Sequence, residues 1–201
     1  LSPAADAATK KKKTRKKAPA VAEAPRPHDP FEVTFPTSDG VTLVATWKPA
    51  ASGPSAPAVL LLHAFSRERP DVAGVAEAFS ARGFATLAID LRGHGESTRK
   101  GGARVPLGAS LQTSPNAFPR DVETACAWLR SRAPRIGVVG FSLSGNLAAL
   151  ATATGWAEAG VAVSANAERL PALAGTRPSK PRGLLVLAAE NRVGSGSFNR
   201  I

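Results

Sequence analysis

Continuous apolar runs restrict the fold of this chain more than any other feature of its sequence. The run APAVLLLH at 56–63 is apolar up to its final histidine, and FATLAID at 84–90 follows a similar pattern. Strands of this kind are buried on both faces, as in parallel sheets that helices cover on both sides. The intervening residues 71–83 carry apolar side chains at helical spacing and end at a glycine. The order therefore predicts a strand, a helix and a second strand.

The same alternation continues along the chain. We expect further strands at 135–140, 160–165 and 183–190, and further helices at 119–133 and 144–153. Two shorter β-type runs, 31–35 and 41–48, are joined by the turn signal PTSDG and predict a leading antiparallel hairpin. Residues 98–118 show no readable periodicity. The sequence thus predicts an α/β fold, a mostly parallel, doubly wound sheet with helices on both faces.

The two ends of the chain differ in composition from the middle. Residues 1–30 read as a disordered, basic, Pro/Ala-rich tail, followed by one domain over 31–190 and an irregular tail over 191–201. The start LSPAADA, residues 1–7, fits the small-residue pattern that precedes a signal-peptidase cut. If these residues are a signal-peptide remnant the protein is exported, and otherwise it is cytoplasmic. The sequence leaves both readings open.

Charge is unevenly spread, because residues 1–30 carry +5 of the formal net charge of +11. The run KKKKTRKK at 10–17 is of the kind that attracts nucleic acid or an anionic surface. No aromatic residue is interleaved with it, so we expect a solvated tail without specific nucleic-acid binding; weak contact with an anionic surface is the alternative. The single Cys126 excludes an internal disulfide, and no apolar run reaches the roughly 18–20 residues of a transmembrane span.

The stretch GFSLSG at 140–145 joins a predicted strand to a predicted helix. A serine on such a sharp turn has strained backbone angles, so the residues two positions before and after it must be small. Gly140 and Ser144 meet that need. The turn places the hydroxyl of Ser142 at a helix N-terminus, where the dipole and free N–H groups favour a developing oxyanion. Ser142 is therefore the candidate nucleophile.

Two other loops follow predicted strands at the same edge of the sheet. In HAFSRERP, residues 63–70, the backbone amide of Ala64 or Phe65 is suited to aim at the oxyanion together with that of Leu143. His63 comes directly after its strand, and we expect it to brace the loop by hydrogen bonding rather than to act as a base. We expect the same bracing role for the histidine in DLRGHGEST, residues 90–98.

The order VLLLHAF, GFATLAIDLRGHGES, RIGVVGFSLSG resembles the α/β-hydrolase superfamily, close to its bacterial esterase, dienelactone-hydrolase-like and serine-aminopeptidase-like branches. The resemblance covers roughly residues 31–190. His63-Ala64-Phe65 matches the H-G-x loop with alanine for glycine, Asp90 to Ser97 matches D-x-R-G-x-G-x-S, and Gly140 to Ser144 matches G-x-S-x-G with serine for the second glycine. These motifs are specific for the fold and less so for any activity.

The resemblance implies a serine hydrolase that cleaves a carboxylic ester or related acyl bond of a small molecule through an acyl-enzyme on Ser142. The amides of Phe65 and Leu143 would hold the oxyanion. The resemblance implies no cofactor and no metal ion.

The acid and the histidine of the triad are expected after the nucleophile in this family. Position 192, where an aspartate is expected, is arginine, and Glu190 is the nearest carboxylate, either a substitute acid or a strand-end residue that points elsewhere. The three histidines, His28, His63 and His94, all precede Ser142. We therefore expect a C-terminally truncated hydrolase domain that lacks its last strand and helix and is impaired in activity. The alternative is a non-catalytic binding module on the same fold.

Overall fold

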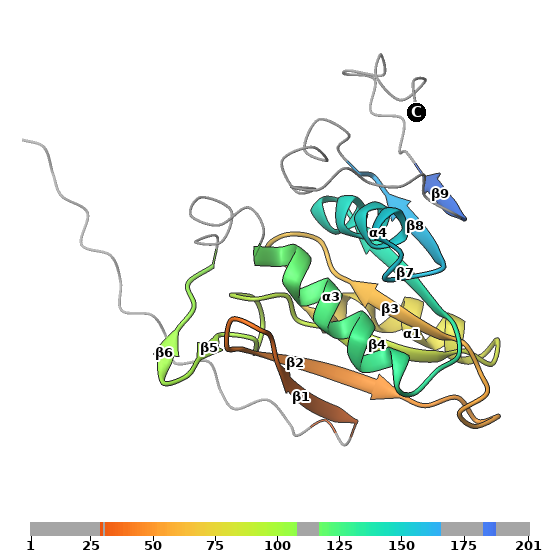
Figure 1. The fold of residues 1–201 in the computed structure, drawn as a ribbon, viewed down its shortest axis with the longest axis horizontal. Coiled ribbons are helices and arrows are strands. Elements are labelled where there is room, and N and C mark those ends of the chain that lie inside the picture. The colour runs from red at the N-terminus through yellow and green to blue at the C-terminus, as the bar shows by residue number, and fades with distance from the viewer. Residues whose placement is uncertain (1–28, 30, 108–116, 166–182, 188–201) are drawn as a thin grey trace, which may run out of the picture.

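A single mixed sheet organises the structure, a computed structural model that describes residues 29, 31–107, 117–165 and 183–187. Its strands are β1 (Glu32–Pro36), β2 (Val41–Lys48), β3 (Ala58–Leu62), β4 (Ala85–Ile89), β5 (Arg99–Lys100), β6 (Ala103–Arg104), β7 (Ile136–Phe141), β8 (Ala159–Val163) and β9 (Leu184–Leu187). The strand order is β6-β5-β2-β4-β3-β7-β8-β9, and β1 pairs with β2 (Figure 1).

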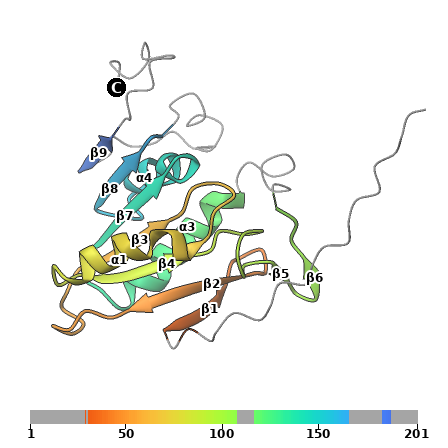
Figure 2. The same cartoon turned by 180° about the vertical axis from the view of Figure 1, so that it is seen from behind.

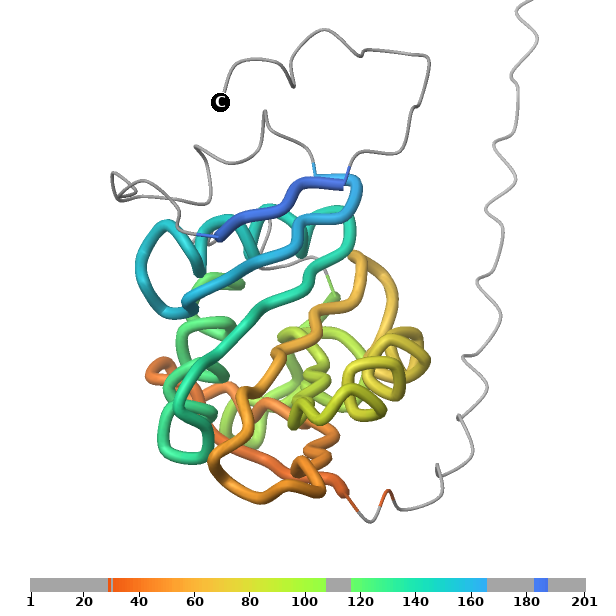
Figure 3. The backbone as a smooth tube through the Cα atoms, turned by 90° about the vertical axis from the view of Figure 1, so that its right-hand side faces the viewer, coloured from red at the N-terminus to blue at the C-terminus, as the bar shows by residue number. Residues whose placement is uncertain are grey.

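Strand direction divides the sheet into two parts. The parallel part consists of five adjacent strands in the order β4, β3, β7, β8 and β9. Figure 3 shows β3, β7, β8 and β9 of this part side by side. β1, β2, β5 and β6 form the antiparallel part. The predicted fold class, a mostly parallel sheet with a leading antiparallel hairpin, is confirmed.

Helices cover both faces of the sheet. The short 3₁₀ helix η1 (Arg69–Val72) leads into α1 (Ala73–Ser80), and the other helices are α3 (Ala117–Arg130) and α4 (Leu143–Thr154). α3 and α4 lie in front of the sheet in Figure 1, whereas α1 is in front when the molecule is seen from behind in Figure 2. None of the helices in the described residues combines the length and hydrophobicity that crossing a bilayer requires.

Alternating side chains of β3 belong to two separate hydrophobic cores, one on each face of the sheet. Leu60 and Leu62 belong to the large core with α3 and α4, whereas Val59 and Leu61 belong to the smaller core with α1. Successive side chains of a strand point to opposite faces, so every residue of β3 is buried. The prediction that the apolar run at 56–63 is buried on both faces is therefore confirmed.

The β5–β6 hairpin differs from the expectation from sequence, and the expected strand at 183–190 is only partly described. The β5–β6 hairpin was not predicted, because two-residue strands of exposed residues carry no apolar alternation. β9 confirms the expected strand over 184–187, and the remainder of 183–190 lies outside the described residues except residue 183. The described part of β9 lies at the sheet edge, with Leu185, Val186 and Leu187 exposed.

The parallel strands place three loops at one edge of the sheet. β4, β3, β7 and β8 are neighbours that run in one direction, so the residues after each strand gather at their carboxyl ends. Open α/β sheets bind ligands at this edge. The loops that the sequence singled out, 63–70, 90–98 and 140–145, all begin there.

Candidate functional site

The turn at Ser142 joins β7 directly to α4. β7 ends at Phe141, α4 begins at Leu143, and Ser142 between them has φ 55° and ψ −118°. A positive φ is uncommon for a residue other than glycine. The side chain of Ser142 is exposed. The strand, the turn and the helix thus lie where the sequence predicts them.

Gly140 explains how this turn closes. A Cβ atom on Gly140 would lie only 1.9 Å from the carbonyl oxygen of Ser144. No side chain fits there, because the obstructing atom belongs to the backbone. The requirement for a small residue is therefore absolute at position 140.

Positive φ angles mark the same edge at two more positions. Among the described residues, the non-glycine residues with positive φ are Ser66, Ser142 and Ser164, at 62°, 55° and 51°. They follow β3, β7 and β8, which are adjacent in the sheet. Strained backbone is retained where the surrounding structure enforces it, often at functional sites. This clustering makes the edge the candidate site.

The two backbone amides that the sequence singled out, those of Leu143 and Phe65, are oriented by the carbonyls of their own peptide units. The carbonyl of Ser142 accepts a hydrogen bond from the Gly145 N–H at 2.9 Å, which sets the direction of the Leu143 N–H. As the first residue of α4, Leu143 has no acceptor for this N–H within the helix. The carbonyl of Ala64 likewise accepts from the Arg67 N–H at 3.0 Å and sets the direction of the Phe65 N–H.

Ser144 makes a contact that its sequence pattern did not reveal. Its side chain is fully buried, and its hydroxyl donates a hydrogen bond to the carbonyl of His63 at 2.5 Å. The sequence indicated only that position 144 had to be small. The bond links residues 81 positions apart, so only the folded chain shows it.

His63 is buried, and both of its ring nitrogens are engaged. Nδ1 donates to the carbonyl of Ala64 at 2.8 Å, and Nε2 accepts from the N–H of Leu91 at 3.1 Å. Burial lowers the pKa of His63 to about 4, so the ring is neutral at pH 7. The expectation that His63 braces the loop is confirmed.

His94 is held in the same way, 5.0 Å from the ring of His63. Nδ1 donates to the carbonyl of Arg92 at 3.0 Å, and Nε2 accepts from the N–H of Ser66 at 3.2 Å. Burial lowers its pKa as well. Its bracing role is confirmed too. His28 and Glu190 lie outside the described residues.

Asp90 organises the loop that follows β4. Its carboxylate is fully buried and accepts from the N–H groups of Arg69 and Glu96, at 2.7 and 3.0 Å. The Arg69 guanidinium adds an ion pair at 3.1 Å. A Cβ on Gly95, where φ is 45°, would lie 2.3 Å from this carboxylate. Gly95 therefore makes room for the carboxylate of Asp90. Burial raises the pKa of Asp90.

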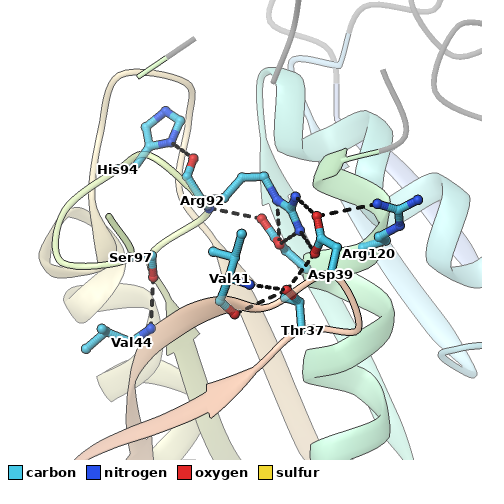
Figure 4. Close-up of polar contacts among 9 residues, drawn as sticks. Thr37, Asp39, Val41, Val44, Arg92, His94, Ser97 and Arg120 are labelled. Carbon is cyan, nitrogen blue, oxygen red and sulfur yellow. Dashed lines mark hydrogen bonds and ion pairs between the residues drawn. The ribbon is translucent and has the colours of Figure 1, made fainter. Parts of the chain in front are cut away.

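Arg92, in the same loop, holds three segments together (Figure 4). It donates to Asp121 of α3 from Nε and Nη2, at 2.9 and 2.7 Å. It also donates to Asp39, in the turn between β1 and β2, at 2.8 and 3.0 Å. Burial raises the pKa of Asp121 to about 6, whereas the hydrogen bonds from Arg92 hold the pKa of Asp39 below its usual range. Arg120 reaches Asp39 at 3.4 Å from a more exposed position.

The described residues around the Ser142 turn form no metal site, and the cavity described below does not include the turn. Within the described residues, no group of three or more His, Cys, Asp or Glu side chains could hold a metal ion. A cavity of about 440 Å³ lies between α1 and the strands β2 and β4, with Arg69, Thr86 and Ala88 in its wall. It contains no residue of the turn, so the candidate site rests on the turn geometry.

Comparison with known proteins identifies the fold. The model of the alpha/beta hydrolase family matches residues 59–199, a range that begins in β3 and passes the domain boundary expected at residue 190. A search of curated proteins found no match. The esterase Pf2001 of Pyrococcus furiosus is 25% identical over 67% of this chain and 51% of its own, with a TM-score of 0.55.

A second solved structure leads to the same family. The alpha/beta hydrolase GrgF of Penicillium sp. sh18 is 26% identical over 70% of this chain and 50% of its own, with a TM-score of 0.54. The matched part of the chain thus spans about half the length of these two structures. Because the family model matches well over half of the sequence, the chain belongs to the alpha/beta hydrolase family.

Proposed function

We propose that the protein is a serine hydrolase that cleaves a carboxylic ester or a related acyl bond of a small molecule, with Ser142 as its nucleophile. The observation that carries the proposal is the conformation of Ser142, exposed, with φ 55°, on a turn that closes only because Gly140 has no side chain. The similarity to the Pyrococcus furiosus esterase supports the reaction class.

The proposed reaction uses the geometry at the start of α4. The Oγ of Ser142 attacks the acyl carbon, the N–H groups of Leu143 and Phe65 stabilise the oxyanion, and the positive end of the α4 dipole adds to that stabilisation. Collapse of the intermediate breaks the bond to the leaving group, which departs as an alcohol with the proton that the Ser142 hydroxyl gives up. Water then cleaves the acyl-enzyme, returns a proton to the Oγ of Ser142 and releases the carboxylic acid.

The base is the unassigned part of this mechanism. The ring nitrogens of His63 and His94 are all occupied by backbone partners, so neither ring serves as the base in this proposal. Glu190 remains the candidate acid.

The hydrogen bonds that occupy the rings of His63 and His94 also favour a second candidate function. Without a base, a serine hydroxyl keeps its high pKa and is a poor nucleophile. A chain in that state would bind an acyl compound at the carboxyl edge of the sheet without cleaving it. This non-catalytic binding module differs from the hydrolase in the reactivity of Ser142.

Hydrolysis of p-nitrophenyl acetate by the full-length gene product and by its Ser142→Ala variant tests the proposal. Ser164→Ala is a matched control, because Ser164 is also an exposed serine with positive φ at the same edge. We expect Ser142→Ala to lose at least about a thousandfold in kcat/KM, whereas Ser164→Ala keeps most of the activity.

Covalent labelling separates the two candidate functions. A fluorophosphonate probe should modify Ser142 in the wild-type chain, with the adduct located by peptide mass spectrometry. Equal hydrolysis by wild type and Ser142→Ala would exclude the serine mechanism. Saturable binding of the ester without labelling or hydrolysis would favour the binding module.

A further inference from the structure

We propose that Ser144 is a positioning residue, whose hydroxyl holds the loop after β3 against the start of α4 and so sets the spacing of the two oxyanion amides. The inference rests on the proposed function, because it concerns the same site. The observation behind it is the buried hydrogen bond from the Ser144 hydroxyl to the carbonyl of His63.

The bond acts on the loop through planar peptide units. The carbonyl of His63 and the N–H of Ala64 belong to one rigid plane, so an anchor on the carbonyl fixes the orientation of that plane. The next plane contains the carbonyl of Ala64 and the N–H of Phe65. It is anchored in turn by the His63 ring at 2.8 Å and the Arg67 N–H at 3.0 Å. Ser144 therefore anchors the first of two consecutive planes that lead to Phe65.

The donor end of this hydrogen bond, Ser144, lies next to the amide of Leu143. Ser144 directly follows Leu143, and the Ser142 carbonyl of the Leu143 peptide unit is held by the Gly145 N–H. The backbone of Ser144 is itself packed against Gly140, so it cannot shift toward β7. One hydroxyl thus connects two rigid pieces of backbone, each of which carries one proposed oxyanion donor.

Other hydroxyls of α4 show that this arrangement is specific. The hydroxyls of Thr152 and Thr154 donate to carbonyls of the same helix, three and four residues earlier. Among the described hydroxyls of α4, that of Ser144 donates to a different segment of the chain. A glycine or alanine at position 144 would satisfy the small-residue requirement of the turn but would remove this connection.

Substitution of Ser144 by alanine, with Thr152→Val as the matched control, tests the positioning role. Both variants remove one buried hydroxyl from α4, but only Ser144→Ala removes the bond to the loop after β3. We expect Ser144→Ala to lower kcat for p-nitrophenyl acetate roughly 10- to 100-fold with KM within about twofold, because donor placement affects the transition state more than substrate binding. Thr152→Val should keep the wild-type kcat, and Ser144→Gly should resemble Ser144→Ala.

A second measurement does not depend on activity. The N–H of Leu91 donates to the His63 ring, so its hydrogen exchange, followed by NMR, reports whether the His63 backbone stays in place. We expect exchange at Leu91 to be at least about tenfold faster in Ser144→Ala and unchanged in Thr152→Val.

These measurements distinguish failure of the positioning role of Ser144 from failure of the proposed hydrolase function. If wild type hydrolyses the ester and Ser144→Ala matches it in kcat, the positioning role is overturned while the hydrolase proposal stands. If wild type and Ser142→Ala are equally inactive, the proposed function fails, and unchanged exchange at Leu91 would also overturn the anchoring by Ser144. If Ser144→Ala does not fold, Ser144→Gly provides the same comparisons.

Discussion

Single residues in this protein acquire their roles from burial and hydrogen bonding rather than from residue type. His63 has the side chain that a serine nucleophile requires as a base, yet it is fully buried with both nitrogens engaged. Its neutral ring connects the loop after β3 to the loop after β4. The consequence is a dependence of stability on pH.

Stability should fall below neutral pH because of His63. Its pKa is 6.5 in an unfolded chain and about 4 in the folded protein, so between these values only the unfolded chain binds the proton. The stabilisation is thus complete above pH 6.5 and is lost as the pH falls toward 4. At pH 5 the loss amounts to about 2 kcal/mol relative to pH 7.

Urea unfolding of wild type and His63→Gln at pH 7 and pH 5 measures this effect. The difference between the two pH values should be about 2 kcal/mol smaller in the variant. His94 and Asp121, whose pKa values are also shifted, remain in both proteins and cancel in the comparison. The same pH dependence in both proteins would show that His63 titrates alike in the folded and unfolded states.

The junction between β7 and α4 is the element that positions the candidate nucleophile. β7 is central in the sheet, between β3 and β8, and its buried residues hold the turn against the large core. Strand and helix meet without a linker longer than Ser142. Such a junction depends on the close approach of two backbone segments, which a single methyl group can prevent.

Gly140→Ala should therefore unfold or strongly destabilise the protein. The added Cβ would lie 1.9 Å from a backbone oxygen, and we expect a loss of more than about 3 kcal/mol in the free energy of unfolding. Gly74→Ala in α1 is the control, because a Cβ there meets nothing within 4 Å. This helical substitution should stabilise by about 0.5–1 kcal/mol. Chemical denaturation gives both values, and comparable stability of the two variants would contradict the close approach.

At the scale of the whole molecule, Arg92 joins the antiparallel hairpin to the parallel core. Its guanidinium contacts Asp39 between β1 and β2 and Asp121 in α3, while its backbone belongs to the loop after β4. The hairpin precedes residue 59, where the family match begins. Arg92 thus couples this leading hairpin to the matched part of the fold.

Removal of Arg92 should destabilise the whole chain. Arg92→Ala leaves the fully buried Asp121 without its partner, and we expect a loss of about 3–5 kcal/mol in the free energy of unfolding. Arg120→Ala removes a half-exposed arginine that also reaches Asp39, and it should cost less than about 1 kcal/mol. Equal urea midpoints for the two variants would show that the buried network does not stabilise the fold.

Much of the architecture could be predicted from local sequence. The strands β3, β4 and β7 and the helices α3 and α4 appear within a few residues of their expected positions, because apolar periodicity reflects burial directly. The β5–β6 hairpin could not be found in this way, since its residues are exposed and its pairing with β2 depends on a distant strand.

The sequence by itself determined the fold class, the place of Ser142 on a strand–helix turn and the need for a small residue at position 140, because each depends on residues close together in the chain. The sequence also predicted that His63 and His94 brace loops, but only the tertiary structure decided which groups they bind and that Ser144 is an anchor as well as a small residue. These roles depend on partners between 28 and 81 positions away. Hydrogen bonds at that separation are set by the packing of the sheet, which no local pattern encodes.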